Sequence, residues 1–370
     1  MDKKLTIGFV GDFCLSQAHK KSTNYLSDAF DLSRKLNNSV DLAIANLEFC
    51  ITPPDVKDVP GMALPAIYAE NLSSAGFDIF CLSNNHIGDY GEDTLLHSKS
   101  FLEERGHLTV GAGKNILDAT QPLYIEKNGF RVAIINVCDE TRYFASEKTA
   151  GISPLAKPII KKMLCVAKKE ADVVIICIHA DLEFSNSPAP WRVALSRELA
   201  ELGPDMIIHH HPHTLQGIEY WNDVIIAYSL GNYIFPIYDG DYMQNREGFV
   251  DEGIYLTVTL VDKQDGTREI SHKITPTQIN KENVTSLATG DKKNNIIIKM
   301  QDYSTILENP SELRRAYFRL CKIQMKTTLM GIYYRIARKE YIVAWQYLKH
   351  HFSTNFHTRW IKGFFTLGQF

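Results

Sequence analysis

The chain has 370 residues, enough for one large hydrophobic core or two modest ones, and its hydrophobic content of 45% and charged content of 22% are ordinary for a globular protein. The net charge of −3 is unevenly distributed, because residues 308–370 hold eleven basic and three acidic side chains and carry +8, while residues 1–307 carry −11. An acidic body of this kind argues against a nucleic-acid-binding protein, so no nucleic-acid partner is expected. No apolar window approaches the roughly 18 residues that a membrane-spanning helix needs.

Strands and helices alternate along most of the chain. In chain order, hydrophobic periodicity and turn residues predict a strand at Leu5–Phe13, a helix at Tyr25–Leu36, strands at Asp41–Phe49 and Phe77–Leu82, a helix at Gly91–Glu104, and a hairpin of Pro122–Glu126 with Arg131–Val137. Then follow a helix at Pro158–Glu170, a strand at Val173–His179, a helix at Trp191–Leu202, a strand at Met206–His209, and two hairpins, Gly217–Trp221 with Val224–Tyr228 and Ile254–Val261 with Glu269–Thr275. This order predicts an α/β fold with a mixed sheet or two packed sheets, and helices outside.

The last part of the chain has a different character. Residues 281–297 are polar and are predicted to form a loop, whereas from Ser311 onward the sequence is helical, basic and aromatic. We therefore place a domain boundary near residue 300, between a body of residues 1–300 and a helical C-terminal region of residues 301–370. The aromatic and basic side chains of this region allow two interpretations. They either pack back on the body as helical core contacts, or form an interfacial patch for anionic lipid or a membrane-associated partner.

The cysteines and the first residues of the chain bear on its compartment. The seven cysteines show no CxxC spacing, and several, such as Cys177, lie within strand-like apolar runs. This usage is typical of reduced, buried thiols in the cytosol. The apolar run Leu5–Val10 is too short for a signal peptide and lacks a small-residue cleavage site. We therefore expect a cytoplasmic protein, with or without peripheral attachment at the inner face of the membrane.

Five apolar runs end abruptly in residues that can bind metal ions. The strongest signal is Met206-Ile207-Ile208, which leads directly into His209-His210-His211-Pro212-His213. The other runs end in Gly11-Asp12, Asn46-Leu47-Glu48, Asn84-Asn85-His86 and His179. Neutral imidazole is the commonest protein ligand for transition metals, and ligands bind at the carboxyl ends of strands in α/β sheets.

All of these signals except Asn84-Asn85-His86 also have a plain structural explanation when they are taken alone. Gly11-Asp12 is often just a turn, Glu48 could face solvent, and an isolated His179 is more often a hydrogen-bonded core histidine. Together, however, the five segments supply carboxylate, amide and imidazole ligands from most of one domain. This mixture suits two closely spaced divalent ions of the Mn, Fe or Zn type. Such a centre, about 3.5–4 Å across, lowers the pKa of a bridging water and clamps an anionic transition state.

The order and spacing of these motifs resemble those of a bacterial capsule-synthesis family, CapA or PGA_cap. The resemblance covers about residues 5–240 and consists of Gly11-Asp12, Asn46-Leu47-Glu48, Asn84-Asn85-His86-x-x-Asp89-Tyr90-Gly91, Gly111-Ala112-Gly113, His179-x-x-x-Glu183, His210-His211-Pro212-His213 and Tyr228-Ser229-Leu230-Gly231-Asn232. That family is associated with poly-γ-glutamate capsules and has a calcineurin-like metallophosphoesterase fold. The resemblance therefore implies a four-layer α/β sandwich, two mixed sheets flanked by helices, followed here by a C-terminal helical extension.

The resemblance also implies a role for each matched residue. Asp12 would be the first-metal carboxylate, Glu48 the bridging carboxylate and His213 a first-metal imidazole. Asn85, His179 and His211 would bind the second metal, and His86 would donate a proton to the leaving group. Five further residues would support the centre or face the substrate: Asn84, Asp89, Glu183, His210 and Asn232. The family pattern usually has a histidine two residues after the first aspartate, where this chain has Cys14, so one ion is either weakly held or bound through a thiolate.

The activity that the resemblance implies is metal-dependent hydrolysis of a phosphoester. The substrate would be a phosphorylated or polyanionic small molecule or polymer, in the synthesis of a capsule, of poly-γ-glutamate or of another surface polymer. Two alternatives stay open, because a fold does not fix a function. The chain could be a non-catalytic assembly or binding component of a capsule synthesis or export complex, or it could hydrolyse or form γ-glutamyl amide bonds.

Overall fold

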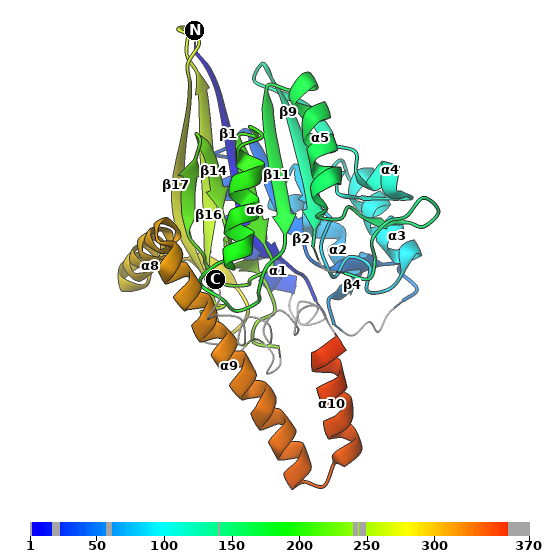
Figure 1. The fold of residues 1–370 in the computed structure, drawn as a ribbon. Helices are drawn as coiled ribbons and strands as arrows, with labels where there is room; N and C mark the ends of the chain where they lie inside the picture. The colour runs from blue at the N-terminus through cyan, green and yellow to red at the C-terminus, as the bar shows by residue number, and fades with distance from the viewer. Residues whose placement is uncertain are drawn as a thin grey trace.

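Two β-sheets packed face to face form the centre of the molecule, and helices cover the outer face of each sheet (Figure 1). The computed structural model describes residues 2–16, 23–56, 61–139, 141–239, 243 and 249–353. The predicted four-layer α/β architecture with a helical C-terminal extension is confirmed in this part of the chain.

The first sheet has eight strands among the described residues, in the order β18-β17-β16-β1-β2-β5-β6, with β15 also paired to β1. Their bounds are Thr285–Leu287 (β18), Arg268–Ile279 (β17), Glu252–Asp262 (β16), Lys3–Phe13 (β1), Leu42–Leu47 (β2), Ile79–Cys81 (β5), Leu108–Val110 (β6) and Asn232–Ile234 (β15). β1, β2, β5 and β6 are parallel, whereas β16 runs antiparallel to β1. β2 and β5 are buried along their whole length, as expected for parallel strands covered on both faces.

The second sheet has six strands in the described chain, in the order β13-β14-β12-β11-β9-β8. Their bounds are Ile218–Trp221 (β13), Val224–Ala227 (β14), Met206–His210 (β12), Val173–His179 (β11), Phe130–Cys138 (β9) and Leu123–Lys127 (β8). The four central strands are parallel, and the predicted hairpins β8–β9 and β13–β14 close the two edges. Their turn residues Asn128, Gly129, Asn222 and Asp223 all have positive φ, as tight two-residue hairpin turns require.

Alternation of side chains along the strands builds the layers. In β11, Ile175 points toward the first sheet and joins Phe9 in the cluster between the sheets, whereas Ile176 packs beneath the outer helices. These helices are α5 (Lys157–Glu170) and α6 (Pro190–Ala200). The opposite face of the first sheet is covered by α1 (Thr23–Asn37), the 3₁₀ helix η2 (Glu70–Ala75) and α3 (Glu92–Glu104).

Short elements in the connections complete the body. β3 (Cys50–Thr52) pairs with β4 (Ala63–Pro65), and β7 (Ala112–Gly113) pairs with β10 (Gly151–Ile152). α2 (Ala66–Ala69) and α4 (Ile116–Ala119) are single-turn helices. Sequence periodicity does not reveal these elements, because two to four residues are too few to show a period.

The prediction of a loop over residues 281–297 is wrong. This segment contains β18 and the beginning of α8 (Gly290–Glu308). Much of α8 faces solvent and is polar, but Ile296 and Met300 lie four residues apart on one helix face and are buried in the cluster between the sheets. This tertiary contact stabilises a helix that the polar composition did not indicate. The boundary predicted near residue 300 falls within α8, and the division into two domains stays a prediction.

In the C-terminal region up to residue 353, two helices follow α8, namely α9 (Pro310–Ala337) and α10 (Tyr341–Ser353). Asn309 caps α9, because its side-chain oxygen accepts hydrogen bonds from two backbone N–H groups in the first turn. Near its start α9 packs on the body through Tyr317, whose ring meets Trp191 edge-on with 4.9 Å between centroids. Beyond this contact, α9 and α10 project from the body as a helical hairpin (Figure 1). Within the described residues, no helix has both the length and the apolar content to cross a membrane.

Candidate metal centre

The predicted metal ligands meet at one end of the two sheets, where β1, β2, β11 and β12 finish. Strand register brings this about: Asp12 pairs with Asn46 of β2 and with Asn232 of β15, and His179 pairs with His210. Because parallel strands end at the same edge of a sheet, the loops that follow them place their side chains next to one another.

Backbone strain is concentrated in the loops after β11 and β12. Four non-glycine residues there adopt left-handed conformations: Asp181 (φ 100°), Phe184 (φ 61°), His211 (φ 99°) and His213 (φ 57°). Such conformations are costly and persist where the surrounding structure fixes them. The backbone N–H of His211 faces Asp12, at 3.3 and 3.2 Å from its two carboxylate oxygens. The strained turn therefore brings both His211 and His213 to the end of β1.

Asp12, Glu48 and His213 form a first group of side chains whose ligand atoms lie within 4.8 Å of one another. All three side chains are buried. The Nδ1 of His213 lies 3.3 Å from Oδ2 of Asp12, and its Nε2 lies 3.7 Å from Oε1 of Glu48. These separations suit a cation bound between the side chains at about 2.0–2.2 Å from each ligand atom.

Glu48, His179 and His211 form a second group, next to the first. The Nε2 of His179 lies 3.5 Å from Oε1 of Glu48 and 2.8 Å from the amide oxygen of Asn85. The rings of His179 and His211 have their centroids 4.7 Å apart. A carboxylate, two imidazoles and an amide oxygen make up the mixed nitrogen and oxygen set that suits Mn, Fe or Zn.

A third group, Glu183 with His211 and His213, overlaps the first two. It shares one imidazole with each of them, whereas the first and second groups share only the Glu48 carboxylate. A carboxylate has two oxygens and can bridge two ions, while a neutral imidazole has a single lone pair. The first and second groups can therefore be filled together, and filling the third competes with both.

Buried polar atoms without partners show that this donor set fits a cation. Both carboxylate oxygens of Glu48 and the Nδ1 of His211 are buried and have no hydrogen-bond partner. An unsatisfied buried polar group costs about 1–3 kcal/mol, and more when it is charged. Divalent ions in the first and second groups would satisfy all three atoms, and the surrounding carboxylates and imidazoles are their usual ligands.

The electrostatics of the carboxylates lead to the same conclusion. Burial raises the pKa of Glu48 well above its usual value, and the neighbouring Asp12 raises it further. Burial also acts to raise the pKa of Asp12, but the hydrogen bond from His213 and the positive charge of that ring outweigh it, so the pKa of Asp12 is lowered. Two buried carboxylates side by side can both be ionised only when positive charge lies between them.

The three histidines of the two groups differ in protonation. Burial lowers the pKa of His179 and of His211, which favours the neutral form that binds metals. Burial also acts to lower the pKa of His213, but the Glu48 and Asp12 carboxylates overcome this and raise it to about 10. A proton on His213 thus supplies part of the positive charge that the carboxylates require.

Asn46 is a site residue that the sequence-based assignment left out. Its Nδ2 donates a hydrogen bond to Oδ1 of Asp12 at 3.0 Å and lies 3.1 Å from the Nδ1 of His179. One amide therefore positions a ligand of each group. The signal that could have revealed it is a polar residue inside the otherwise apolar β2, directly before the Glu48 turn.

His86, the predicted proton donor, lies next to the centre but outside the three ligand groups. Its Nδ1 is 2.8 Å from Oδ2 of Asp89, and the two side chains are 27% and 33% exposed. Asn84 holds the turn in place: its Nδ2 donates to the carbonyl oxygen of Leu47 at 2.7 Å, and its Oδ1 accepts from the backbone N–H groups of His86 and Ile87. Asn84 is therefore structural, and Asp89 orients the His86 ring.

The contacts of His210 and Asn232 favour a supporting position over a substrate-facing one. His210 donates from Nε2 to the carbonyl oxygen of Val10 at 3.0 Å, which joins the two sheets. The Oδ1 of Asn232 lies 3.0 Å from the Nδ1 of His213, and its Nδ2 donates to the carbonyl oxygen of the same histidine at 3.2 Å. The side chain of His209 points to the opposite face of the second sheet from that of His210, and its Nε2 lies 2.9 Å from the hydroxyl of Ser196 on α6.

Cys14 takes no part in the three ligand groups. Its Sγ is fully buried, 3.5 Å from the Sδ of Met62 and 3.7 Å from the carbonyl oxygen of Leu15. Burial raises the pKa of this thiol well above its usual value, and the nearby Glu48 raises it further. The neutral thiol is a poor metal ligand, so the geometry gives no support to binding through a thiolate.

The fold and this centre define an α/β protein with metal-competent carboxylate and imidazole side chains gathered where its strands end. The chain belongs to the family described as bacterial capsule synthesis protein PGA_cap, whose model matches residues 6–237, so the predicted family is confirmed. It is similar to the capsule biosynthesis protein CapA of Bacillus anthracis, with 29% identity over 249 residues, 63% of this chain and 60% of that protein. It is also similar to the PGA biosynthesis protein CapA of Bacillus subtilis (strain 168), with 27% identity over 313 residues and 81% of each chain covered.

Among solved structures, a hypothetical protein from Thermus thermophilus has a TM-score of 0.46 and 14% identity, with 74% of this chain and 99% of that chain covered. The 5'-nucleotidase from Candida albicans has a TM-score of 0.44 and 13% identity, with 82% and 58% covered. Both are distant similarities.

Proposed function

We propose that this chain is a metal-dependent hydrolase of the phosphoesterase type, acting in the biosynthesis of a capsule, of poly-γ-glutamate or of a related surface polymer. Membership of the PGA_cap family, and similarity to two CapA proteins named for capsule and PGA biosynthesis, support the pathway. One observation carries the chemistry: the buried Glu48 carboxylate, which has no hydrogen-bond partner, is shared by two groups of metal-competent side chains.

In this proposal, Asp12, Glu48 and His213 hold one divalent ion, and Glu48, Asn85, His179 and His211 hold the other. When bound, such ions activate water as a nucleophile and neutralise charge on a phosphoryl group. Asn46 keeps Asp12 and His179 in place through its amide nitrogen. Because Asp12, Glu48 and His179 are shielded from solvent, their charges act in a medium of low dielectric constant, where they are felt more strongly than in water.

His86 is the proposed proton donor to the leaving-group oxygen. It follows Asn85 directly in the chain, and its partial exposure allows it to reach a substrate at the mouth of the centre. Asp89 accepts a hydrogen bond from Nδ1, so the ring is oriented and Nε2 is the nitrogen that transfers the proton. After transfer, the ring keeps its Nδ1–H bonded to Asp89. Glu183 is proposed to contact the substrate or to support the rings of His211 and His213, and its proximity to both rings supports this.

The proposed substrate is a phosphorylated or polyanionic small molecule or polymer. Metal quantification, combined with hydrolysis assays on an aryl phosphate and an aryl phosphodiester, tests this. We expect the chain loaded with Mn, Fe or Zn to hydrolyse at least one of them, and Glu48→Gln to hydrolyse neither. If the chain releases glutamate from a γ-glutamyl polymer and cleaves neither phosphoester, the proposed reaction would be hydrolysis of amide bonds at the same centre.

A second candidate function is a non-catalytic component of a capsule synthesis or export complex. Cys14 favours it, because a neutral buried thiol stands where the phosphoesterase pattern has a ligand histidine. A scaffold need not retain stoichiometric metal. A chain that purifies without Mn, Fe or Zn, and whose thermal midpoint does not respond to these ions, would favour this second candidate.

A cytoplasmic location remains part of the proposal. It is supported by the cysteines: all seven lie in the described part of the chain as free thiols, and six of them are buried. Such thiols are typical of a reducing compartment.

A further inference from the structure

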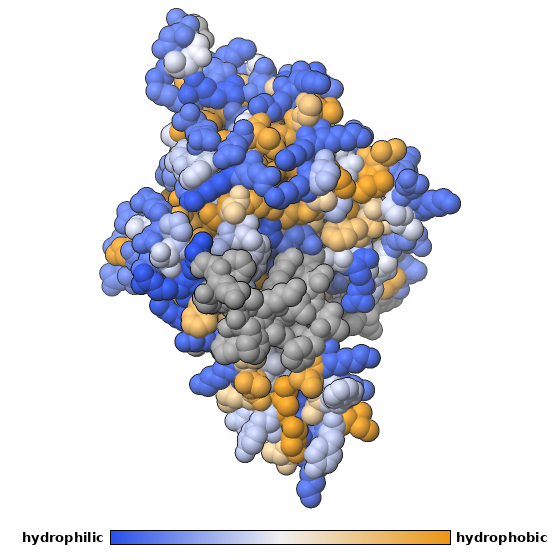
Figure 2. Space-filling view, viewed as in Figure 1, coloured by the Kyte–Doolittle hydropathy of each residue, from blue (hydrophilic) through white to orange (hydrophobic). Residues whose placement is uncertain are grey.

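The projecting part of the C-terminal region, residues 322–349 at the end of α9 and in α10, is hereafter the hairpin. Of the twenty large hydrophobic side chains that are exposed in the described residues, half lie between positions 323 and 345. They are Ile323, Leu329, Met330, Tyr333, Tyr334, Ile336, Tyr341, Ile342, Val343 and Trp345. Figure 2 shows hydrophobic surface on the hairpin with hydrophilic surface beside it. A monomeric soluble protein rarely gathers so many large exposed apolar side chains in one segment without a partner.

The packing of the two helices explains why these side chains stay outside. α9 and α10 meet at Gly331, where an added Cβ would lie 2.8 Å from the hydroxyl of Tyr347. The Arg335 guanidinium covers the same Tyr347 ring at 4.0 Å from its centroid, and Ala344 is buried. The contact between the helices therefore uses small and polar groups. Most of the large apolar side chains are left on the outer faces of the hairpin.

Positive charge accompanies this apolar surface. Five exposed cations lie in the hairpin, and Glu340 is its only acidic residue. The cations are Lys322, Lys326, Arg338, Lys339 and Lys349. The body, by contrast, carries −11 over residues 1–307. The hairpin points away from the body (Figure 1). It can therefore approach an anionic surface, although such a surface would repel the acidic body.

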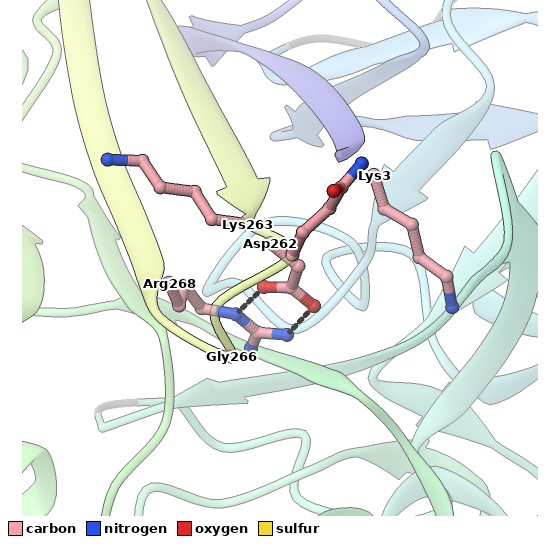
Figure 3. A pocket seen from close by; sticks show the side chains of 6 residues that line it. Lys3, Asp262, Lys263, Gly266 and Arg268 are labelled. Atoms are coloured by element: carbon pink, nitrogen blue, oxygen red, sulfur yellow. Dashed lines mark hydrogen bonds and ion pairs between the residues drawn. The ribbon is translucent and has the colours of Figure 1, made fainter. Parts of the chain in front are cut away.

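A second basic cluster, at the far end of the molecule, does not have this character. Lys3, Lys263 and Arg268 line a pocket there, but Arg268 is paired in a fork with Asp262, at 2.6 and 2.9 Å (Figure 3). Arg268 also contacts Asp205 at 2.8 Å. Acidic side chains thus offset this cluster, and it lacks exposed aromatic residues. Among the described residues, the combination of exposed Trp and Tyr side chains with cations that form no salt bridge distinguishes the hairpin.

We infer that the hairpin binds the surface of a membrane containing anionic lipids and lies in its interface without crossing it. Tyr and Trp side chains favour the boundary between lipid headgroups and hydrocarbon, and Lys and Arg pair with anionic headgroups. No helix among the described residues is apolar and long enough to span the bilayer, which agrees with an interfacial position. A symmetric dimer through the same face fits less well, because it would place the cations of two hairpins against each other.

The test mixes the 370-residue chain with vesicles of phosphatidylcholine alone, and with vesicles that also contain phosphatidylglycerol, and separates bound protein by sedimentation. We expect binding only to the anionic vesicles, and less of it at higher salt. Arg338→Glu/Lys339→Glu should weaken binding at least about twentyfold, since each cation near an anionic surface strengthens binding about fivefold. Ile342→Ser/Trp345→Ser should weaken it as well, by removing apolar surface that enters the interface.

Two matched controls separate this surface from general effects of charge and hydrophobicity. Lys148→Glu/Lys281→Glu makes the same charge change on exposed positions of the body, and Ile67→Ser/Leu117→Ser removes equally exposed apolar side chains there. Both controls should bind like the parent chain. Equal binding to both kinds of vesicle, or equal losses in the controls, would overturn the inference. Failure to bind either kind of vesicle would also overturn the inference. Light scattering then shows whether the chain is a monomer, or a dimer that Ile342→Ser/Trp345→Ser dissociates.

Discussion

The Nε2 of His179 lies 3.5 Å from Oε1 of Glu48, although the two residues come from different sheets. His179 ends β11 in the second sheet, and Glu48 follows β2 in the first. The candidate metal centre is therefore built across the contact between the two sheets, and its geometry depends on how they pack. Metal binding and folding stability should be coupled for this reason.

Replacing Glu48 should abolish metal-dependent stabilisation, because this carboxylate belongs to both ligand groups. At a metal concentration about a hundredfold above Kd, the parent chain should gain about 2.7 kcal/mol in its free energy of unfolding for each ion that it binds. Glu48→Gln should gain almost nothing in the same thermal denaturation measurement. Glu201→Gln, an exposed substitution on the body, should respond to metal like the parent chain. A full metal response in Glu48→Gln would contradict its bridging position.

Asn46→Ala should weaken metal binding by about 10–100-fold, the usual effect of losing a residue that orients ligands. The cause is the loss of the amide that holds Asp12 and lies against His179. Asn37→Ala is a matched control, because Asn37 is also buried and hydrogen-bonded, to the carbonyl oxygen of Ala75 and the hydroxyl of Tyr255, but lies away from the centre. Titration calorimetry should show normal metal affinity for Asn37→Ala. Equal losses in the two variants would reduce Asn46 to a purely structural residue.

His86→Ala should lower phosphoester turnover by about 10²–10⁴-fold, the range for loss of a general acid. Its metal content should not change, since His86 is outside the ligand groups. Asp89→Asn should have a smaller effect on turnover and should shift its pH profile, because Asp89 hydrogen-bonds the His86 ring. Steady-state kinetics and elemental analysis of the same samples check both points. Unchanged turnover in His86→Ala would remove this residue from the proposed mechanism.

Metal affinity should rise with pH. The pKa of His213 is raised to about 10 from an ordinary value of 6.5, so the ring is protonated at neutral pH and must lose its proton when it binds a cation. Affinity should therefore increase up to about tenfold per pH unit as long as this proton is present. Without metal, folding stability depends on pH in the opposite direction. The contribution of His213 to the free energy of unfolding is complete below pH 6.5 and is lost as the pH rises through about 10.

Titration calorimetry in two buffers of different ionisation enthalpy measures these protons directly. Release of roughly one proton or more per bound ion at neutral pH is expected. Binding with no proton release and no dependence on pH would show that His213 is not a ligand.

Only Cys165 should react with a thiol reagent in the native protein. It is exposed on α5, whereas the other six cysteines are buried. Burial raises the pKa of Cys14 in particular, so its thiol should not bind metal. A Co²⁺-substituted sample should therefore lack a sulfur-to-metal charge-transfer band. Such a band in the parent chain, lost in Cys14→Ser, would establish the thiolate alternative.

The sequence was sufficient to predict the strands that carry the centre and the residues that end them. β12 was predicted from an apolar run stopped by histidines, and the structure brings His211 and His213 to Asp12 and Glu48 as the motif order implied. The pairing of Asn46 with both groups could not be predicted, because it depends on the register between β1 and β2 and on the contact with the second sheet. The roles of these residues in chemistry remain predictions.

α8 shows the same limit in the fold. Its composition is polar, and its helical state depends on Ile296 and Met300 entering a cluster formed by strands far away in the chain. Local pattern therefore predicted elements that carry their own periodicity. It failed for elements that are stabilised by tertiary contacts.

The most direct test is the number of divalent ions held by each chain, measured by elemental analysis after equilibration with Mn²⁺ or Zn²⁺ and removal of unbound ions. Two ions per parent chain, and fewer than one per Glu48→Gln chain, is the expected result. A parent chain that retains no ion, or a Glu48→Gln chain that retains both, would contradict a two-metal centre bridged by this carboxylate.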